Sequence, residues 1–303
     1  MTFPHVDSPA AWRVSEIEQD KGWIFRLGDA ARAQLAEAVK AAFDADRPLF
    51  DYRGRDIDLG PALDTIRDAA MEAHAGRGVS LVKGLPRDAL SAPEFRFMNW
   101  AIGLHLGVAR PQGIKSQYIS EVRAVGHTYR AANGRGYNSN AGLDFHTDSI
   151  TAWNILLAER PDLAEVACQP FYFSRNTEQA PDEGPYYGQP LFDMAEGHMF
   201  GKWNRNRVRT AQDIEGVPQL TDAQKECTDL LDDILRRPEV MFTMWLEPGD
   251  LQLMNNHVML HSRTPFEDFE EDGRQRLLYR LWLATPNSLR LPESWGGYFR
   301  SIE

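Results

Sequence analysis

The sequence predicts a mostly β domain with helices packed outside its β core. Strand-like apolar runs bounded by glycine, proline and asparagine recur at short intervals in the last third of the chain, which favours a sandwich or barrel. Helical patterns concentrate in the first third. The sequence contains no convincing linker, internal repeat or low-complexity tract. We therefore expect one domain over residues 1–303, with a helical part at about residues 1–110 that packs on the β core.

The first third combines helical and strand-like segments. Apolar residues recur at helical spacing over residues 28–47 and 60–75, which predicts two helices. Residues 76–86 form a short apolar run between glycines and a proline, which is typical of a strand. A third helix is expected after Ser91, whose hydroxyl can cap it together with Glu94.

The middle of the chain is predicted to contain two further helices and a long loop. We expect a helix over residues 154–168 that breaks near Pro161. Residues 169–208 are rich in aromatic residues and are predicted to be irregular. Residues 220–240 have an amphipathic pattern, with Thr221 as candidate N-cap and basic residues toward the end.

The last third is predicted to be β structure again. Residues 247–266 have the pattern strand, turn, strand, with Pro248-Gly249-Asp250 as a tight reversal. An acidic turn follows, and residues 276–285 then have the composition of another strand.

The charge balance excludes some classes of function. Lys and Arg number 33 against 44 Asp and Glu, which gives a formal net charge of −11. Binding to a phosphate backbone needs clustered positive charge, so we expect no nucleic-acid partner. A local basic pocket for a small anion remains compatible with this balance.

The N-terminus and the cysteines indicate the compartment. The first residues carry acidic side chains and no long apolar run, so they do not resemble a signal peptide. No segment has the apolar length needed to cross a bilayer, so we expect a cytoplasmic protein without a membrane partner. Cys168 and Cys227 lack metal-site spacing, and we expect two reduced thiols.

A candidate metal site begins with a His-x-Asp pair. His146 and Asp148 are two residues apart, and on an extended strand they point to the same side. Two histidines and one carboxylate on one face of an octahedron suit ferrous iron and leave three positions open. Taken alone, the pair is a weak signal and is more typical of a surface or core-edge histidine near a solvated aspartate.

The second strand segment supplies two candidate histidines. His257 and His261 are four residues apart, and on one strand they would share a face. Periodicity therefore does not choose between them.

Together these segments resemble the TauD/TfdA group of Fe(II)/2-oxoglutarate oxygenases, which is related to clavaminate synthase. That group typically has an H-x-D pair after a short strand, a Gly-Asp turn, an Asn-rich strand and H-x-R-x-x-F. The matching residues here are His146-Thr147-Asp148, Gly249-Asp250, Asn255-Asn256 and His261-Ser262-Arg263-Thr264-Pro265-Phe266. Supporting matches extend from residues 76–86 to residues 276–283.

The resemblance implies a fold, a metal and an activity. The fold would be a double-stranded β-helix (jelly roll), and His146, Asp148 and His261 would hold a catalytic Fe(II). His257 would then be a structural or pocket-lining residue. The activity would be hydroxylation or a related oxidation of a substrate C–H bond by O2, with conversion of 2-oxoglutarate to succinate and CO2. A carboxylate at Asp148 occupies the place that halogenating relatives leave to a halide.

Two arginines are candidates for binding the co-substrate. Arg276 and Arg280 are four apart on a predicted strand, hence on one face, and an arginine can bind a carboxylate through two parallel hydrogen bonds. The resemblance assigns the 2-oxoglutarate carboxylate to Arg276 and places Arg280 further along, toward substrate. The alternative is that both form surface salt bridges with acidic residues of 267–272.

The chain departs from the family pattern after the His-x-Asp pair. In the family, an additional strand pair and a long connection deliver a serine or threonine to the 2-oxoglutarate carboxylate. Here Ser149 runs almost directly into residues that resemble the following helix, so that segment is shortened or absent. Thr151, or Ser149, is the candidate replacement hydroxyl.

The expected partners are 2-oxoglutarate, O2 and a small polar substrate, and a homo-oligomer is compatible with the sequence. Residues 169–208 form either an aromatic wall of the substrate pocket or loop hydrophobics that cover the core. Four amide residues could also line the pocket: Gln112, Gln117, Asn138 and Asn140. Two alternatives remain: a degenerate relative that binds metal or ligand without turnover, and a zinc or manganese isomerase or hydrolase on the same scaffold.

Overall fold

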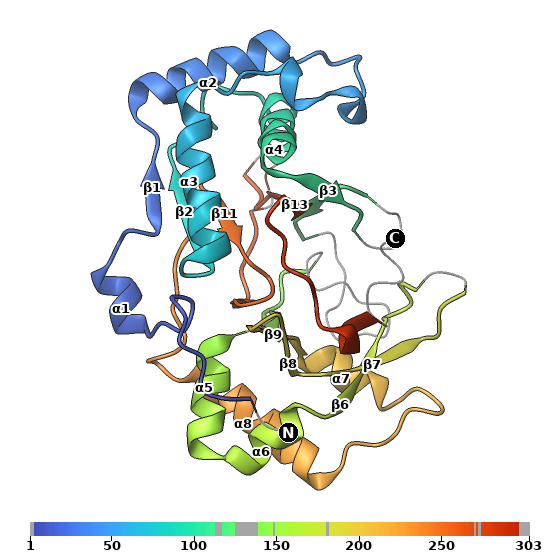
Figure 1. Cartoon of the computed structure of the whole chain (residues 1–303). Coiled ribbons are helices and arrows are strands. Elements are labelled where there is room, and N and C mark those ends of the chain that lie inside the picture. The colour runs from blue at the N-terminus through green and yellow to red at the C-terminus, as the bar shows by residue number, and fades with distance from the viewer. Residues whose placement is uncertain are drawn as a thin grey trace.

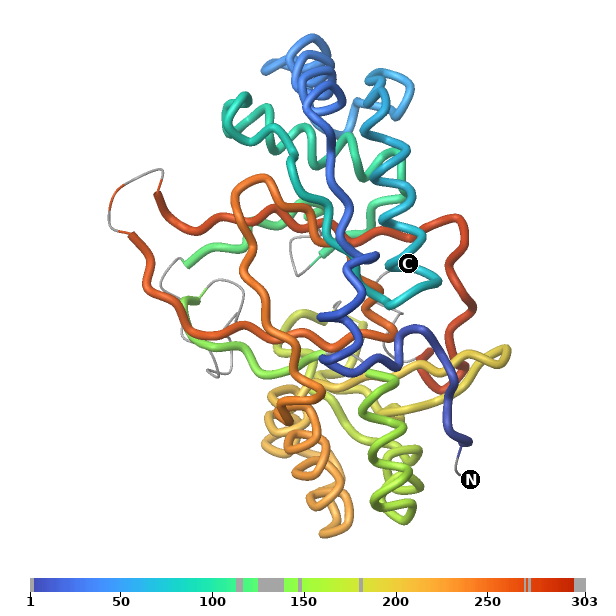
Figure 2. The backbone as a smooth tube through the Cα atoms, turned by 90° about the vertical axis from the view of Figure 1, so that its left-hand side faces the viewer, coloured from blue at the N-terminus to red at the C-terminus, as the bar shows by residue number. Residues whose placement is uncertain are grey.

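The strands of the protein lie between two groups of helices (Figures 1 and 2). The computed structural model describes residues 3–112, 117–124, 139–147, 149–179, 182–269, 271 and 274–296. The group at the top of Figure 1 comprises α2 (Asp29–Ala42), α3 (Pro61–Ala75) and α4 (Ala92–Leu106). The group at the bottom comprises α5 (Ile150–Glu159), α6 (Pro161–Ala167) and α8 (Asp222–Arg236). Two further helices are α1 (Val14–Gln19) and α7 (Arg205–Ala211).

Three sheets of three strands each lie between these helices. The first has the order β1 (Ile24–Arg26), β2 (Val79–Lys83), β11 (Leu251–Met254). The second has the order β3 (Val108–Arg110), β13 (Leu278–Ala284), β4 (Ile119–Val122). The third has the order β10 (Trp203–Asn204), β5 (Leu143–Thr147), β12 (Leu260–Arg263). β1 and β2 pair in parallel, and the other neighbours in these sheets are antiparallel.

Strand β2 separates two hydrophobic cores. Val79 and Leu81 belong to the core that contains α5 and α8, whereas Val82 belongs to the core that contains α3 and α4. Ser80, which faces α3, is fully buried, and its hydroxyl donates to the carbonyl oxygen of Ala69 at 2.6 Å. Since both faces of β2 are buried, its sequence is a continuous apolar run rather than an alternating one.

The predicted helices are confirmed, with their caps. Ser91 accepts a hydrogen bond from the backbone of Glu94, and Thr221 accepts one from Gln224, so both helices begin with a capping box. The expected break at Pro161 separates α5 from α6. The expected strands of the last third are β11, β12 and β13.

The prediction that residues 169–208 are irregular is wrong. This stretch contains the hairpins β6 (Pro170–Ser174) with β7 (Tyr186–Pro190) and β8 (Phe192–Ala195) with β9 (His198–Gly201), followed by β10 and most of α7. The strands are short and interrupted by glycine and proline, which obscured the alternating pattern. The two residues between β8 and β9, Glu196 and Gly197, both have positive φ, as a tight hairpin turn of type I′ requires.

The description as mostly β is also too strong. The fold is β-rich with helices, but helices cover more of the described residues than strands do. The helical part at residues 1–110 also contains β1, β2 and β3.

The structure also describes the helix lengths and both cysteines. Among the described residues, no helix is long and apolar enough to cross a bilayer. Cys168 and Cys227 are both free thiols, and burial raises their pKa to about 11 and about 12 respectively.

The Gly-Asp turn before β11 is bonded to Lys83 of β2 and to Leu85, which follows β2. Asp250 accepts a hydrogen bond from the backbone N–H of Glu247 at 2.9 Å and forms an ion pair with Lys83 at 3.2 Å. The carbonyl of Gly249 accepts from the backbone N–H of Leu85 at 3.1 Å. The turn therefore sets the register of β11 on β2.

Replacing Gly249 with alanine should destabilise the protein more than the same change at Gly197. Both glycines have positive φ, 88° and 83°. At Gly249 the added Cβ would lie 2.5 Å from the carbonyl oxygen of Leu85, whereas no described atom lies within 4 Å of the Cβ at Gly197. We expect the free energy of unfolding in urea to fall by about 1 kcal/mol for Gly197→Ala and by about 3 kcal/mol for Gly249→Ala. Equal losses would contradict the close approach at Gly249.

Candidate active site

The predicted metal-binding histidines come from two adjacent antiparallel strands. His261 of β12 lies directly opposite His146 of β5, and Asn204 of β10 lies opposite His146 on its other side. Directly opposed residues project from the same face of a sheet. The centroids of the two imidazole rings are 4.0 Å apart, with an interplanar angle of 59°. The structure thus places side by side two ligands that are more than a hundred residues apart in the chain.

Both imidazoles are neutral. Burial lowers the pKa of His146 to about 4 and that of His261 well below its usual value, and the positive charge of Arg280 lowers both further. Neutral imidazole is the form that binds a metal ion. The Nδ1 atom of His146 lies 2.9 Å from the carbonyl oxygen of Asp144, which can only accept. Nδ1 therefore carries the hydrogen, and Nε2 is the atom available to a metal.

His261 supplies the clearest test of whether this pair fits a metal ion. Its Nδ1 atom is buried and has no hydrogen-bond partner in the part of the chain that the structure describes. An unsatisfied buried polar atom costs roughly 1–3 kcal/mol, a cost that is removed only when that atom itself gains a partner, such as a metal ion. The donor set therefore fits Fe(II) at the two histidines.

The third predicted ligand, Asp148, lies outside the described residues. Within those residues, no group of three His, Cys, Asp or Glu side chains could hold a metal ion. The role of Asp148 therefore remains a prediction.

Arg280 is brought to the histidine pair by strand β13. The neighbouring Tyr279 and Leu281 face α4, where Tyr279 packs 6.3 Å from the ring of Phe95. Since side chains alternate along a strand, Arg280 points to the opposite face. Its positive charge lowers the pKa of both histidines.

Arg276 lies just before β13, not within a strand as predicted. Burial lowers its pKa, and its Nη1 atom is buried without a hydrogen-bond partner among the described residues. The guanidinium carbon lies 5.0 Å from the ring centroid of Phe266. Asp268 accepts the backbone N–H of Arg276 at 2.7 Å, and no ion pair of Arg276 with a described acidic residue is found. A buried guanidinium nitrogen without a partner is suited to an incoming carboxylate.

The arginine and phenylalanine of the H-x-R-x-x-F motif have structural roles that sequence reasoning did not assign. Arg263 donates to the carbonyl oxygens of Ser139 at 2.7 Å and Ala141 at 2.6 Å. The backbone N–H of Phe266 donates to the carbonyl oxygen of Asn140 at 3.1 Å. These bonds tie the end of β12 to the segment that leads into β5. The fixed spacing of Arg263 and Phe266 after His261 was the sequence signal that could have indicated these structural roles.

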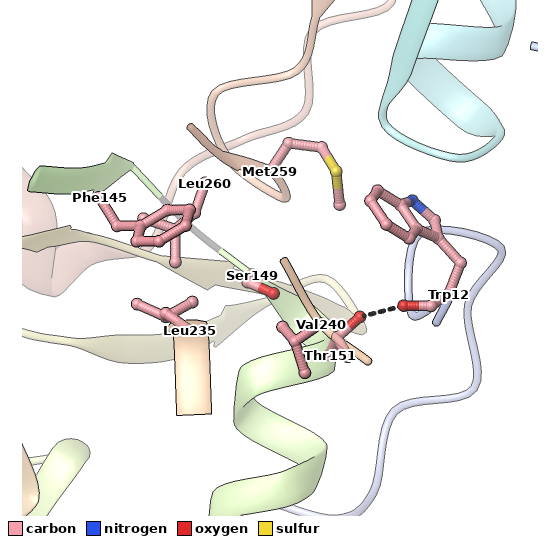
Figure 3. A pocket seen from close by; sticks show the side chains of 8 residues that line it. All are labelled: Trp12, Phe145, Ser149, Thr151, Leu235, Val240, Met259 and Leu260. Carbon is pink, nitrogen blue, oxygen red and sulfur yellow. Dashed lines mark hydrogen bonds between the residues drawn. The ribbon is translucent and has the colours of Figure 1, made fainter. Parts of the chain in front are cut away.

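The structure does not bring Thr151 or Ser149 to the histidines. Both line a cavity of about 30 Å³ together with Phe145 and Leu260, the residues that precede His146 and His261 (Figure 3). Because successive residues of a strand point to opposite faces, this cavity lies behind the histidine pair.

The hydroxyls of both residues serve helix α5. Thr151 donates to the carbonyl oxygen of Trp12 at 3.0 Å, and Ser149 caps α5 by accepting the N–H of Ala152 at 3.2 Å. The assignment of Thr151 to the co-substrate is therefore corrected. The physical reason is that α5 begins at Ile150, which turns the chain away from the site at once.

His257 does not share a face with His261. It lies in the turn between β11 and β12, and its ring packs 5.9 Å from Phe200 and 6.1 Å from Trp295 of the short helix η4 (Glu293–Trp295). Burial lowers its pKa to about 4. A structural role among aromatic rings agrees with these contacts.

The amide residues proposed for the pocket have different environments. Gln112 is buried with a relative exposure of 1% and bonds to Arg280, whereas Asn140 is exposed. Gln117 donates to the hydroxyl of Ser120 at 3.0 Å. Asn138 lies outside the described residues.

Thr151→Val should separate stability from co-substrate binding. The variant loses the hydrogen bond to Trp12, and we expect the free energy of unfolding to fall by about 1 kcal/mol. The dissociation constant for 2-oxoglutarate, measured anaerobically with Fe(II), should not change. A tenfold weaker binding of 2-oxoglutarate would restore Thr151 to the co-substrate site.

The chain is similar in sequence to a family of dioxygenases and to a curated synthase. The model of the "Taurine catabolism dioxygenase TauD, TfdA family" matches residues 142–282. The FR-33289 synthase of Streptomyces rubellomurinus (strain ATCC 31215) is 26% identical over an alignment 324 residues long. This alignment covers 96% of this chain and 95% of that protein.

Solved structures of iron oxygenases share the fold. Asparagine oxygenase in complex with Fe(II), 2S,3S-3-hydroxyasparagine and succinate superposes with a TM-score of 0.59 at 15% identity, over 86% of this chain and 93% of that one. The non-heme iron oxygenase OrfP in complex with Fe and alpha-ketoglutaric acid gives a TM-score of 0.58 at 17% identity, with the same coverage. At these identities the likeness concerns the fold.

The family match runs from the start of β5 into β13 and includes both histidines of the pair and both arginines. Over these residues, the chain is similar to the TauD, TfdA family of dioxygenases.

Proposed function

We propose that this Fe(II)- and 2-oxoglutarate-dependent oxygenase hydroxylates, or otherwise oxidises, a C–H bond of a small polar molecule, with release of succinate and CO2. The observation that carries the proposal is the pair of buried, neutral imidazoles held side by side across β5 and β12. The family match and the similarity to FR-33289 synthase support the same class of enzyme.

Each predicted site residue has a separate role in this proposal. His146, His261 and Asp148 would hold the iron, and the carbonyl of Asp144 orients the His146 ring so that Nε2 faces the metal. Arg276 would bind the far carboxylate of 2-oxoglutarate through its buried guanidinium. Iron and 2-oxoglutarate, when bound, supply the oxygen activation and the oxidising chemistry.

The substrate class is proposed from charge and from the neighbours. Besides Arg280, Lys202 and Arg207 act electrostatically on His146, so the site is locally positive in an acidic protein. Such a site favours a substrate that carries an acidic group. Asparagine oxygenase is solved with a hydroxylated asparagine, and OrfP is solved with L-Arg. We propose small amino acids and related acids as the first substrates to screen.

The proposal extends to the arrangement of the sheets and to the number of domains. We propose that the sheets β10-β5-β12 and β3-β13-β4 are the two walls of a double-stranded β-helix, within a single domain over residues 1–303. Strand β2, which contributes to both hydrophobic cores, supports one domain. A cytoplasmic location, the use of O2 and homo-oligomer formation remain predictions. The degenerate relative and the zinc or manganese enzyme are not favoured.

Anaerobic titration with Fe(II) and then 2-oxoglutarate tests the proposal. The parent protein should develop the weak visible charge-transfer band of the iron chelate, and His261→Ala should abolish it because a metal ligand is lost. Arg276→Ala should raise the dissociation constant for 2-oxoglutarate about 10- to 100-fold, since hydrogen bonds to charged groups contribute roughly 1.5–3 kcal/mol.

Arg274→Ala is the matched control for Arg276→Ala. Arg274 is two residues away, and its side chain is 59% exposed and paired with Glu271. It should bind 2-oxoglutarate like the parent. If the parent takes up iron but shows no band, or if both arginine variants behave alike, the assignment of the co-substrate site is wrong. Succinate formation that depends on O2 and on an added amino acid would identify the substrate class.

A further inference from the structure

We propose that Gln112 is a positioning residue that fixes the guanidinium of Arg280, the second arginine of the candidate site, and excludes one way in which that guanidinium can meet an acidic group. The inference rests on the proposed function, because it concerns the same site. It arises from contacts of the Gln112 side chain, which no motif in the sequence indicates.

The orientation of the Gln112 amide is determined by its partners. The Nε2 atom donates to two carbonyl oxygens, that of Tyr118 at 2.9 Å and that of Arg280 at 3.1 Å. A carbonyl oxygen can only accept, so the NH2 group must be on this side. The amide oxygen is then on the opposite side, where it accepts the Nε–H of Arg280 at 2.8 Å. A flipped amide would place oxygen against two oxygens.

The backbone of Gln112 is equally fixed. Its N–H donates to the carbonyl of Gln117 at 2.8 Å, and its own carbonyl accepts from Gln117 at 3.2 Å, which forms an isolated antiparallel bridge. The residue is 1% exposed, so its hydrogen bonds lie out of water. Buried hydrogen bonds that satisfy every group of a side chain restrict it to one conformation.

Arg280 is therefore held at its Nε atom by Gln112. The ring of Trp282, the next residue on the same face of β13, lies 5.3 Å from the guanidinium carbon and limits its movement further. The charge of Arg280 also lowers the pKa of His146 and of His261, which agrees with a place of this arginine near the pair.

This arrangement restricts the geometry of recognition. An arginine can bind a carboxylate side-on, through Nε and one terminal nitrogen, or end-on, through its two terminal nitrogens. Since Gln112 uses the Nε–H, the side-on mode is closed to an acidic group at Arg280. Gln112 thus excludes one direction from which an acid can bind this arginine.

Replacement of Gln112 by leucine tests the proposal, with Gln117→Leu as the matched control. Gln117 is the bridge partner of Gln112, and its amide bonds to Ser120 rather than to Arg280. The first readout needs no ligand: solvent exchange of the Arg280 Nε–H, followed by NMR after arginine-selective labelling. Exchange should accelerate at least about tenfold in Gln112→Leu and stay unchanged in Gln117→Leu. Unchanged exchange in Gln112→Leu would overturn the proposal.

A double-mutant cycle with Arg280→Ala gives the second readout, with Fe(II) and 2-oxoglutarate as the probe. We expect Gln112→Leu to raise the dissociation constant for 2-oxoglutarate about fivefold, and the double variant to bind no more weakly than Arg280→Ala alone. Independent, multiplying losses would show that Gln112 only stabilises the fold. If the parent binds no 2-oxoglutarate, the proposed function fails, and the exchange measurement still decides the role of Gln112.

Discussion

The antiparallel pairing of β5 with β12 is the constraint on which the rest of the site depends. It places His261 opposite His146 with the rings 4.0 Å apart, although the two residues are distant in the chain. A shift by one residue would turn one imidazole to the other face, toward the cavity lined by Phe145 and Leu260. The bonds from Arg263 and Phe266 to residues 139–141 hold that register at the open end of the strand pair.

Burial and local charge give this site its chemical character. The protein carries a net charge of −11, yet the described surroundings of His146 contain Arg280, Lys202 and Arg207. Burial and these cations lower the pKa of His146, and burial, His146 and Arg280 lower that of His261, so both imidazoles are neutral, the form that binds a metal ion.

The shortened connection after β5 has a structural counterpart on the other side of the sheet. Helix α5 starts at Ile150, and the N-terminal segment packs against it through Trp12, Pro4 and Val6. Asn154 pairs with both backbone polar groups of Val6 at 2.8 Å. The hydroxyl of Thr151 is taken up by this packing, so the family's additional hydroxyl is not replaced from here.

The sequence by itself determined the helices with caps and the apolar strand β2, and it singled out the two histidines that the structure brings together, because these depend on local periodicity and on motif spacing. It could not determine the hairpins of residues 169–208, whose short strands are stabilised by pairing with each other rather than by local preference. It also misplaced Thr151, because the direction of a side chain after a strand depends on where the next helix begins. The contact of Gln112 with Arg280 joins residues 168 positions apart. Only the tertiary structure decides such a contact, because the sequence around Gln112 contains no pattern that predicts its distant hydrogen-bond partner.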